Sequence, residues 1–237
     1  MKKIQGAHTA IITPFHALGE LNEEGLRENI RFQIQNGING IVALGTTGET
    51  PTLTDREKEK IIRISREETK DKIQLTIGTG CYSTQETIES TQLAYELGAD
   101  MALVVVPYYN RPTQEGIYRH FKAIAEAVDI PIIIYNVPSR TGQNMLTSTL
   151  SRLVQIPNIC GVKETSGNIG QISEVIESVR RTNPNFSVVS GDDAITLPLM
   201  ALGGDGIITP TVRSQEQTEM GIYWAYDGTP NLGTPPR

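Results

Sequence analysis

One lysine stands near the end of a short apolar segment, Ile159-Cys160-Gly161-Val162-Lys163-Glu164. The apolar residues are typical of a buried strand, and Asn168 is a suitable N-cap for a following helix. In a β/α barrel the reacting groups gather at the C-terminal ends of the strands, where a lysine is partly withdrawn from water. Desolvation disfavours the ammonium form, so Lys163 could attack a carbonyl carbon and form a Schiff base. The alternative is a lysine whose stem packs while its ammonium group reaches solvent.

A second apolar segment ends in Tyr135, and the turn at 137–139 is expected to bring Arg140 back over it. A phenol can act as a general acid or base beside an amine, and a guanidinium can hold a carboxylate through paired hydrogen bonds. Each residue alone is equally well explained as a core tyrosine or a solvated arginine. Their expected position at the same end of the sheet as Lys163 favours the catalytic interpretation.

Two further loops carry groups that could take part. In Gly45-Thr46-Thr47-Gly48-Glu49 the glycines let the backbone approach a ligand, and the hydroxyls and amides can bind a carboxylate or pass a proton. In Pro107-Tyr108-Tyr109-Asn110-Arg111-Pro112 one phenol could serve in a proton relay. The alternatives are an ordinary polar turn for the first loop and interface aromatics for the second.

Short apolar segments alternate with longer amphipathic segments along most of the chain, an order that predicts a parallel sheet. Eight such segments predict an α/β fold, a closed TIM (β/α)8 barrel, over residues 1–212. We expect the strands at 8–13, 40–44, 73–77, 101–106, 130–136, 159–163, 187–190 and 206–209. The competing fold is an open nucleotide-binding sheet, but the nearest glycine fingerprint, at 78–83, follows the third strand and lacks its last glycine.

Local signals mark the ends of the expected helices. The segments 54–57 and 83–86 fit the capping box, in which a hydroxyl and a carboxylate satisfy free backbone amides. Gly37, Gly98 and Gly203 each follow a helical segment and precede an apolar one, which predicts the same helix-to-strand joint three times.

Composition narrows the classes of partner and cofactor. The chain has 237 residues and a formal net charge of −6, which argues against nucleic-acid and acidic-membrane partners. Cys81 and Cys160 are far apart, the three histidines have no metal-ligand spacing, and Asp192-Asp193 is better explained by helix capping than by magnesium binding. No apolar stretch approaches membrane-spanning length, so we expect a soluble cytoplasmic protein without a metal or nucleotide cofactor.

Together these motifs resemble the family of pyruvate-dependent class I aldolases that contains dihydrodipicolinate synthase and N-acetylneuraminate lyase. The resemblance covers residues 9–211, and within the family the motifs look most like those of the dihydrodipicolinate synthase branch. Arg140 in its Val-Pro-Ser-Arg setting is the most specific mark of that branch.

The resemblance implies a role for each candidate residue. Lys163 would form a Schiff base with pyruvate, and Arg140 would bind the carboxylate of L-aspartate 4-semialdehyde. The product would be 4-hydroxy-tetrahydrodipicolinate, on the route to diaminopimelate and lysine, formed in a homodimer or homotetramer. Tyr135, Thr46 and Tyr109 would form a proton relay, in which Tyr109 reaches into a neighbouring subunit. The pyruvate carboxylate would be bound at Thr47, Gly45, Gly48 and the Ile208 backbone.

The chain departs from the family pattern in two places. Asp55, Lys58 and Tyr82 replace residues typical of lysine-inhibited members, although Glu86 and Tyr108 match them. Residues 213–237 show neither a normal eighth helix nor the family's C-terminal helical extension, which predicts an irregular tail and a truncated or altered chain of low stability. The functional alternatives are another pyruvate-dependent 2-keto acid aldolase and a degenerate barrel without catalytic activity.

Overall fold

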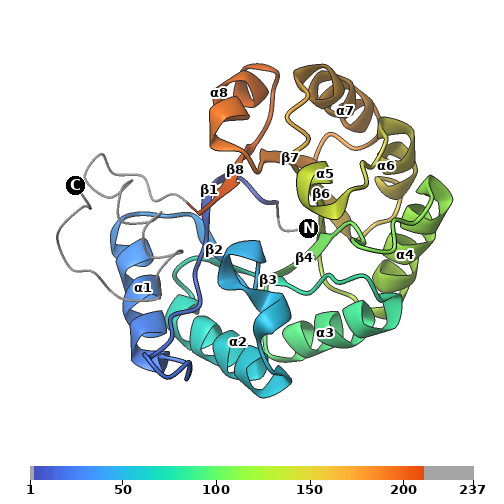
Figure 1. Ribbon diagram of the computed structural model, residues 1–237. Helices are drawn as coiled ribbons and strands as arrows, with labels where there is room; N and C mark the ends of the chain where they lie inside the picture. The colour runs from blue at the N-terminus through green and yellow to red at the C-terminus, as the bar shows by residue number, and fades with distance from the viewer. Residues whose placement is uncertain (1–2, 211–237) are drawn as a thin grey trace.

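Eight parallel strands close into a barrel in the order β1 to β8, and β8 pairs back to β1 (Figure 1). The structure is a computed structural model that describes residues 3–210. The predicted (β/α)8 architecture is therefore confirmed. The strands are β1 (Gly6–Ala10), β2 (Gly40–Ala43), β3 (Gln74–Gly78), β4 (Met101–Val105), β5 (Ile132–Asn136), β6 (Ile159–Glu164), β7 (Ser187–Ser190) and β8 (Gly206–Thr209).

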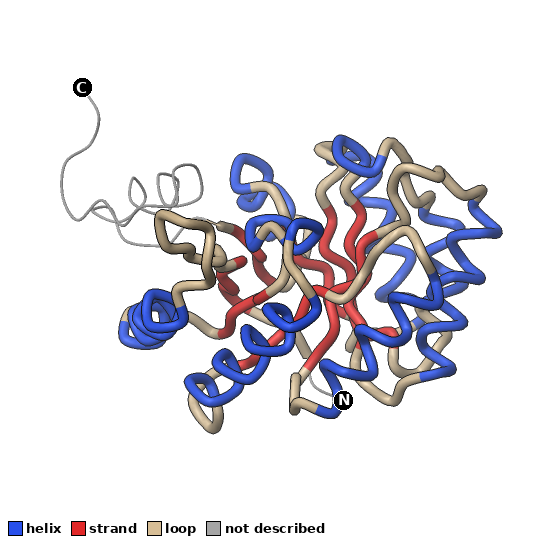
Figure 2. The backbone as a smooth tube through the Cα atoms, turned by 60° about the horizontal axis from the view of Figure 1, so that its bottom comes forward, coloured by secondary structure: helices blue, strands red, loops and turns tan. Residues whose placement is uncertain are grey.

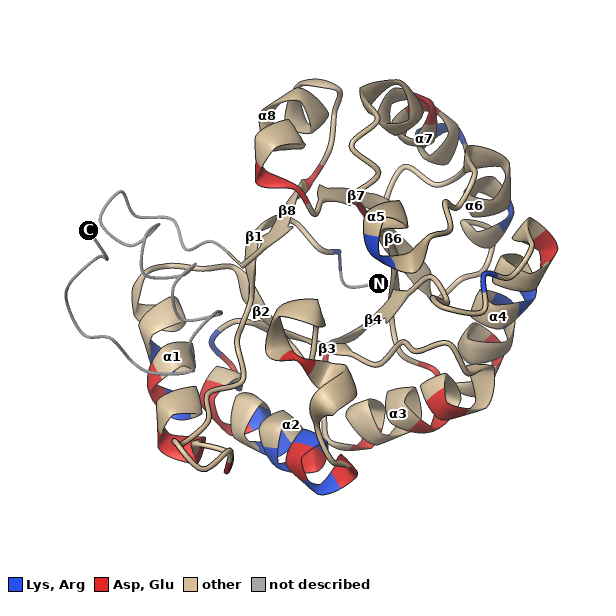
Figure 3. Cartoon of the chain, viewed as in Figure 1, with Lys and Arg blue, Asp and Glu red and all other residues tan. Residues whose placement is uncertain are grey.

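Helices surround the strands on the outside of the barrel, as Figure 2 shows. The charged residues are concentrated on these helices (Figure 3), for example where Arg27 and Arg31 of α1 bind Glu68 of α2 at 3.0 and 2.8 Å. The helices are α1 (Glu23–Gln35), α2 (Asp55–Thr69), α3 (Thr84–Glu96), α4 (Gln114–Ala127), α5 (Pro138–Thr141), α6 (Thr147–Leu153), α7 (Ile169–Thr182) and α8 (Asp193–Ala201), with 3-10 turns η1 (Thr46–Gly48) and η2 (Thr50–Thr52).

The first strand lies earlier in the chain than the sequence predicts. It runs over Gly6–Ala10 rather than 8–13, because residues 6–9 pair with Gly206–Thr209 of β8. Thr13 lies beyond the strand, and its hydroxyl donates to the Gly48 carbonyl at 2.7 Å. The residues that the alternation assigned to the end of β1 therefore support the η1 turn.

The helix-end signals are largely confirmed. Thr54 and Glu57 form the complete capping box at the start of α2. At α3 only half of the predicted box forms: Ser83 accepts from the Glu86 amide at 3.3 Å, whereas the Glu86 carboxylate accepts from the Cys81 thiol at 3.7 Å.

The repeated glycine joint is confirmed as well. Gly37, Gly98 and Gly203 all have positive φ angles, of 76°, 85° and 100°. A residue with a Cβ atom would be strained there.

Side chains alternate between the barrel interior and the helix layer. Ile133 and Tyr135 of β5 pack in the interior, together with Val189 and Ile208, whereas Ile132 and Ile134 pack against the surrounding helices. This period of two is the signature of a strand. The interior is a packed core whose residues reach up to Tyr135 at the strand ends.

The predicted division between a barrel at 1–212 and a tail at 213–237 stays a prediction, because residues 213–237 lie outside the described residues. The predicted absence of a barrel helix after β8 stays a prediction for the same reason. Among residues 3–210, no helix is long and apolar enough to cross a membrane.

Candidate active site

Lys163 lies at the C-terminal end of β6, directly beside Tyr135 of β5 in the strand register. Only 6% of the lysine and 7% of the tyrosine are exposed. The Lys163 Nζ atom is 4.3 Å from the centroid of the Tyr135 ring. An amine and a phenol are thus held together inside the mouth of the barrel, as the pattern of strand ends predicted.

Burial lowers the pKa of Lys163 to about 7, because an ammonium ion loses its hydration there. The positive charge of Arg140 lowers this pKa further, and the Asp193 carboxylate opposes the change. Near neutral pH a large fraction of Lys163 is therefore the free amine, the form that attacks carbonyl carbons.

Burial also raises the pKa of Tyr135. Hydrogen bonding to Thr46 and the charge of Arg140 act in the opposite direction, since both favour the phenolate. Tyr135 therefore holds its proton at neutral pH while hydrogen-bonded to Thr46, an arrangement suited to passing protons at the amine beside it.

The loop that carries Thr46 and Thr47 is held on two sides. The Thr13 hydroxyl donates to the Gly48 carbonyl at 2.7 Å, and the Thr50 hydroxyl donates to the Gly45 carbonyl at 3.0 Å. Just before the loop, Leu44 has a φ of 56°, an uncommon conformation for a residue with a branched side chain. This turn places Thr46 over the barrel mouth.

Gly78, at the end of β3, packs against the start of the same loop. The sequence predicted only a strand-end turn at Gly78 and gave no sign of this contact. A Cβ atom there would lie 2.0 Å from the Leu44 carbonyl oxygen. The glycine of this fingerprint-like segment therefore allows close backbone packing against the Leu44 turn, and α3 begins only at Thr84, after the segment has ended.

A cavity of about 740 Å³ opens beside these residues. Gly45, Thr46, Tyr135 and Arg140 line one part of it. The cavity continues over α2 and α3, where the lining residues include Asp55, Lys58, Tyr82, Glu86 and Tyr108. Asp55, Lys58 and Tyr82, which depart from the pattern of lysine-inhibited members, thus share a cavity with Thr46 and Tyr135.

Tyr109 and Ile208 lie in contrasting environments. Tyr109 is 90% exposed, with a φ of 66°, so the described chain does not bring it to Lys163. Tyr108 lines the cavity instead, with its ring edge-on to Tyr82 at a centroid distance of 5.5 Å. Ile208 is fully buried in the barrel interior.

Gly191, after β7, is a neighbour of the lysine that sequence reasoning missed. A Cβ atom there would lie 2.5 Å from Lys163 Cε and 2.0 Å from Thr165 Oγ1. Because Gly191 directly follows a predicted strand, the sequence does place it at the C-terminal end of the barrel. Nothing in the local sequence indicates that it contacts Lys163.

Other candidate groups have structural explanations. Asp192 caps α8 by accepting from the Ala194 amide at 3.0 Å, which confirms the capping interpretation. Burial lowers the pKa of His8 and of His120 to about 4, so both rings are neutral. Among residues 3–210, no group of three or more His, Cys, Asp or Glu is arranged to hold a metal ion.

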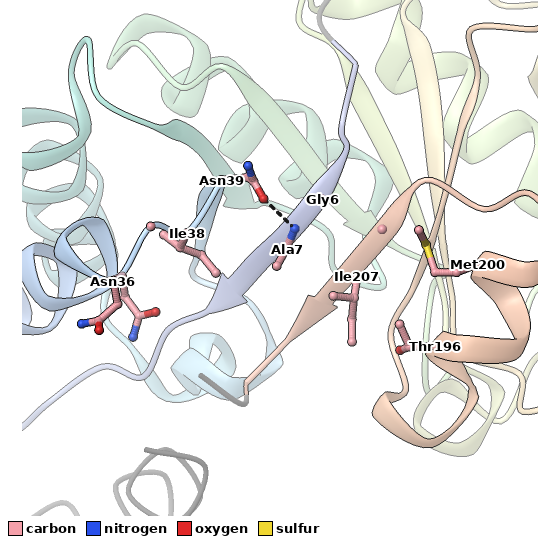
Figure 4. Close-up of a pocket in the computed structure, with 11 residues that line it drawn as sticks. Gly6, Ala7, Asn36, Ile38, Asn39, Thr196, Met200 and Ile207 are labelled. Carbon is pink, nitrogen blue, oxygen red and sulfur yellow. Dashed lines mark hydrogen bonds between the residues drawn. The ribbon is translucent and has the colours of Figure 1, made fainter. Parts of the chain in front are cut away.

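A second cavity, of about 330 Å³, lies between α1 and α8 beside β1 and β8 (Figure 4). Its lining includes Asn36, Asn39, Thr196, Met200 and Ile207. None of the candidate catalytic residues takes part in it, so it is separate from the site around Lys163.

Comparisons with known proteins agree with this geometry. The 4-hydroxy-tetrahydrodipicolinate synthase of Protochlamydia amoebophila is 55% identical to this chain, over 87% of this chain and 69% of the relative. That of Syntrophus aciditrophicus is 52% identical, over 86% of this chain and 69% of the relative. The solved dihydrodipicolinate synthase of Thermotoga maritima is 42% identical, with a TM-score of 0.85 over 87% of this chain and 70% of that one.

The chloride-inhibited dihydrodipicolinate synthase of Acinetobacter baumannii, solved in complex with pyruvate, is 45% identical to this chain. Its TM-score is 0.83, over 86% of this chain and 69% of that one. The family model described as the dihydrodipicolinate synthetase family matches residues 3–228. Sequence, barrel and relatives therefore agree that this chain belongs to the dihydrodipicolinate synthetase family.

Proposed function

We propose that this chain is a lyase that condenses pyruvate with L-aspartate 4-semialdehyde to give 4-hydroxy-tetrahydrodipicolinate, in diaminopimelate and lysine biosynthesis. One observation carries the proposal: a buried lysine with a pKa of about 7 lies against a buried tyrosine at the mouth of the barrel. Relatives that bear this activity in their names support it, as does the relative solved with pyruvate.

The first step is formation of the Schiff base. The Lys163 amine attacks C2 of pyruvate, and loss of water from the adduct gives an imine. Tyr135, hydrogen-bonded to Thr46, passes the protons that this exchange requires. The imine then serves as the electron sink, so the proposed reaction uses neither metal nor nucleotide.

The second step joins the two substrates. Loss of a proton from C3 of the imine gives an enamine, whose C3 attacks the aldehyde carbon of the semialdehyde. The amino group of the semialdehyde then attacks C2, which closes the ring and releases the Lys163 amine. Hydroxyl and amide groups at Thr47, Gly45 and Gly48, with the Ile208 backbone, hold the pyruvate carboxylate in this proposal, and Arg140 holds the carboxylate of the semialdehyde.

Trapping the imine tests the proposal. We expect incubation with pyruvate and borohydride to leave a reduced pyruvyl group on Lys163, mapped by mass spectrometry of the digested protein. Folded protein that gives no adduct would refute the proposed function and favour a non-catalytic barrel. An adduct with no turnover of any aldehyde would also favour a non-catalytic barrel, whereas an adduct with turnover of other aldehydes but not of the semialdehyde would favour another pyruvate-dependent aldolase.

The pH dependence of trapping follows from the pKa of Lys163. Because only the free amine reacts, the trapping rate should fall about tenfold between pH 8 and pH 6 and level off above pH 8. An ordinary lysine would instead show a rate that keeps rising up to about pH 10. Initial rates of adduct formation across this range distinguish the two profiles.

Replacing Arg140 with alanine tests the second substrate. We expect kcat/KM for the semialdehyde to fall about 100-fold, because a charge-assisted carboxylate contact is lost. The Lys163 adduct should still form, with the midpoint of its pH profile shifted slightly upward, since Arg140 helps to lower the pKa of Lys163. Equal losses for the semialdehyde and for aldehydes without a carboxylate would contradict the assigned role.

The remaining expectations concern assembly and location. We propose a homodimer or homotetramer in which Tyr109 enters the site of a neighbouring subunit, supported by its 90% exposure and its left-handed backbone. A cytoplasmic location and the absence of a cofactor stay predictions from the sequence.

A further inference from the structure

Two polar side chains are buried immediately next to the candidate catalytic pair. Asn136 follows Tyr135 in β5, Glu164 follows Lys163 in β6, and each is only 1% exposed. Asn136 and Glu164 are also register partners, like Tyr135 and Lys163. Because side chains alternate along a strand, Asn136 and Glu164 lie on the helix side of the barrel wall, behind the site.

The pair is joined by hydrogen bonds. Asn136 Nδ2 donates to the Glu164 carboxylate, at 3.1 Å to Oε2 and 3.3 Å to Oε1. The backbone amide of Ser166 donates to Glu164 Oε1 at 2.8 Å. Burial raises the pKa of Glu164, and the bonds from Ser166 and Asn136 oppose that change. The contacts therefore cross-link the two strands and fix the turn that follows Lys163.

The same asparagine also holds the segment that carries Arg140. Asn136 Oδ1 accepts from the Met145 amide at 3.0 Å, and Nδ2 donates to Asn144 Oδ1 at 2.9 Å. Asn136 precedes α5, and residues 144 and 145 follow it, so one side chain ties both ends of the Arg140 segment. Gln171 at the start of α7 completes the network by accepting from Asn144 Nδ2 at 2.8 Å.

We propose that Asn136 and Glu164 are positioning residues that set Lys163, Tyr135 and Arg140 relative to one another from behind the barrel wall. Their effect is geometric: the charges that shift the pKa of Lys163 belong to Arg140 and Asp193. A misplacement of about 1 Å is enough to cost a reaction about 100-fold in rate. The expected loss of turnover in variants of this pair rests on the proposed function, whereas the expected change in the pKa of Lys163 does not.

Two variants and two readouts test the proposal. In Asn136→Ala we expect the pKa of Lys163, measured by competitive acetylation without substrate, to rise from about 7 by one unit or more, because a loosened wall admits water. We expect kcat to fall about 10- to 100-fold, with a smaller change in KM for pyruvate. Glu164→Gln keeps one oxygen for Ser166 and Asn136, so its effects should be in the same direction and smaller.

Glu68→Gln is the matched control, since Glu68 is a buried carboxylate between α1 and α2, held by Arg27 and Arg31. It should lower the melting temperature and leave kcat and the Lys163 pKa unchanged. If both network variants behave like this control, their role is structural and the proposal is wrong. Should Asn136→Ala fail to fold, Glu164→Gln decides by the same criteria.

The acetylation readout separates two kinds of failure. If the wild-type protein forms no pyruvate adduct, the proposed function fails, but the comparison of Lys163 pKa values still decides whether the network positions the lysine. If the wild-type protein forms the adduct and turns over the semialdehyde, and both kcat and the Lys163 pKa are the same in all variants, the proposed function stands and the positioning role fails.

Discussion

We expect the replacement of Lys163 with alanine to remove the pyruvate adduct and to lower turnover by about 10,000-fold or more, the size of loss typical when a covalent nucleophile is deleted. The physical reason is that Lys163 is the buried amine beside Tyr135, with a pKa lowered to about 7 by desolvation. Borohydride trapping and steady-state rates with both substrates measure the effect.

Lys122→Ala is the control for this experiment, because Lys122 is a half-exposed lysine on α4 that pairs with Glu126 at 3.6 Å. It should keep both adduct and turnover. A reduced adduct that persists at another lysine in Lys163→Ala, together with normal rates, would show that the nucleophile lies elsewhere.

A single added methyl group at Gly191 is expected to lower both the stability of the protein and kcat. In Gly191→Ala the new Cβ atom would lie 2.5 Å from Lys163 Cε, so the lysine stem must move. Overpacking of this kind costs about 1–3 kcal/mol in stability. A displaced amine should also lower kcat about 100-fold. Thermal melting and single-turnover adduct formation measure the two effects.

Gly170→Ala serves as the comparison, since the added Cβ atom on α7 would have its nearest contact at 3.2 Å, on the Asn168 side chain. This variant should keep the wild-type rate of adduct formation. If Gly191→Ala matches it, the lysine stem has room to move without losing its reactive position.

The order of the elements and the location of the reacting groups could be read from the sequence. The alternation of apolar and amphipathic segments predicted eight strands, because each parallel strand must be buried and each helix must cover it with one face. The same pattern placed Lys163, Tyr135 and the Thr46 loop at strand ends. Local chemistry also predicted the Thr54 capping box and the positive φ angles of Gly37, Gly98 and Gly203.

Other features depend on contacts that the strand and helix patterns do not predict. Half of the predicted capping box at Ser83 is absent because the Glu86 carboxylate lies by the Cys81 thiol instead. The first strand begins at Gly6 because β8, two hundred residues later, supplies its partner. The first outcome comes from a competing contact five residues away, and only the second depends on a segment far along the chain.

By itself, the sequence determined the barrel, the strand ends and the lysine with its neighbours, because these follow from periodicity and local residue type. Only the tertiary structure decided the distance of Lys163 from Tyr135, the contact with Gly191, the exposure of Tyr109 and the buried Asn136–Glu164 pair. The reason is that closing the barrel fixes the strand register, and register brings side chains from distant segments together and removes them from water.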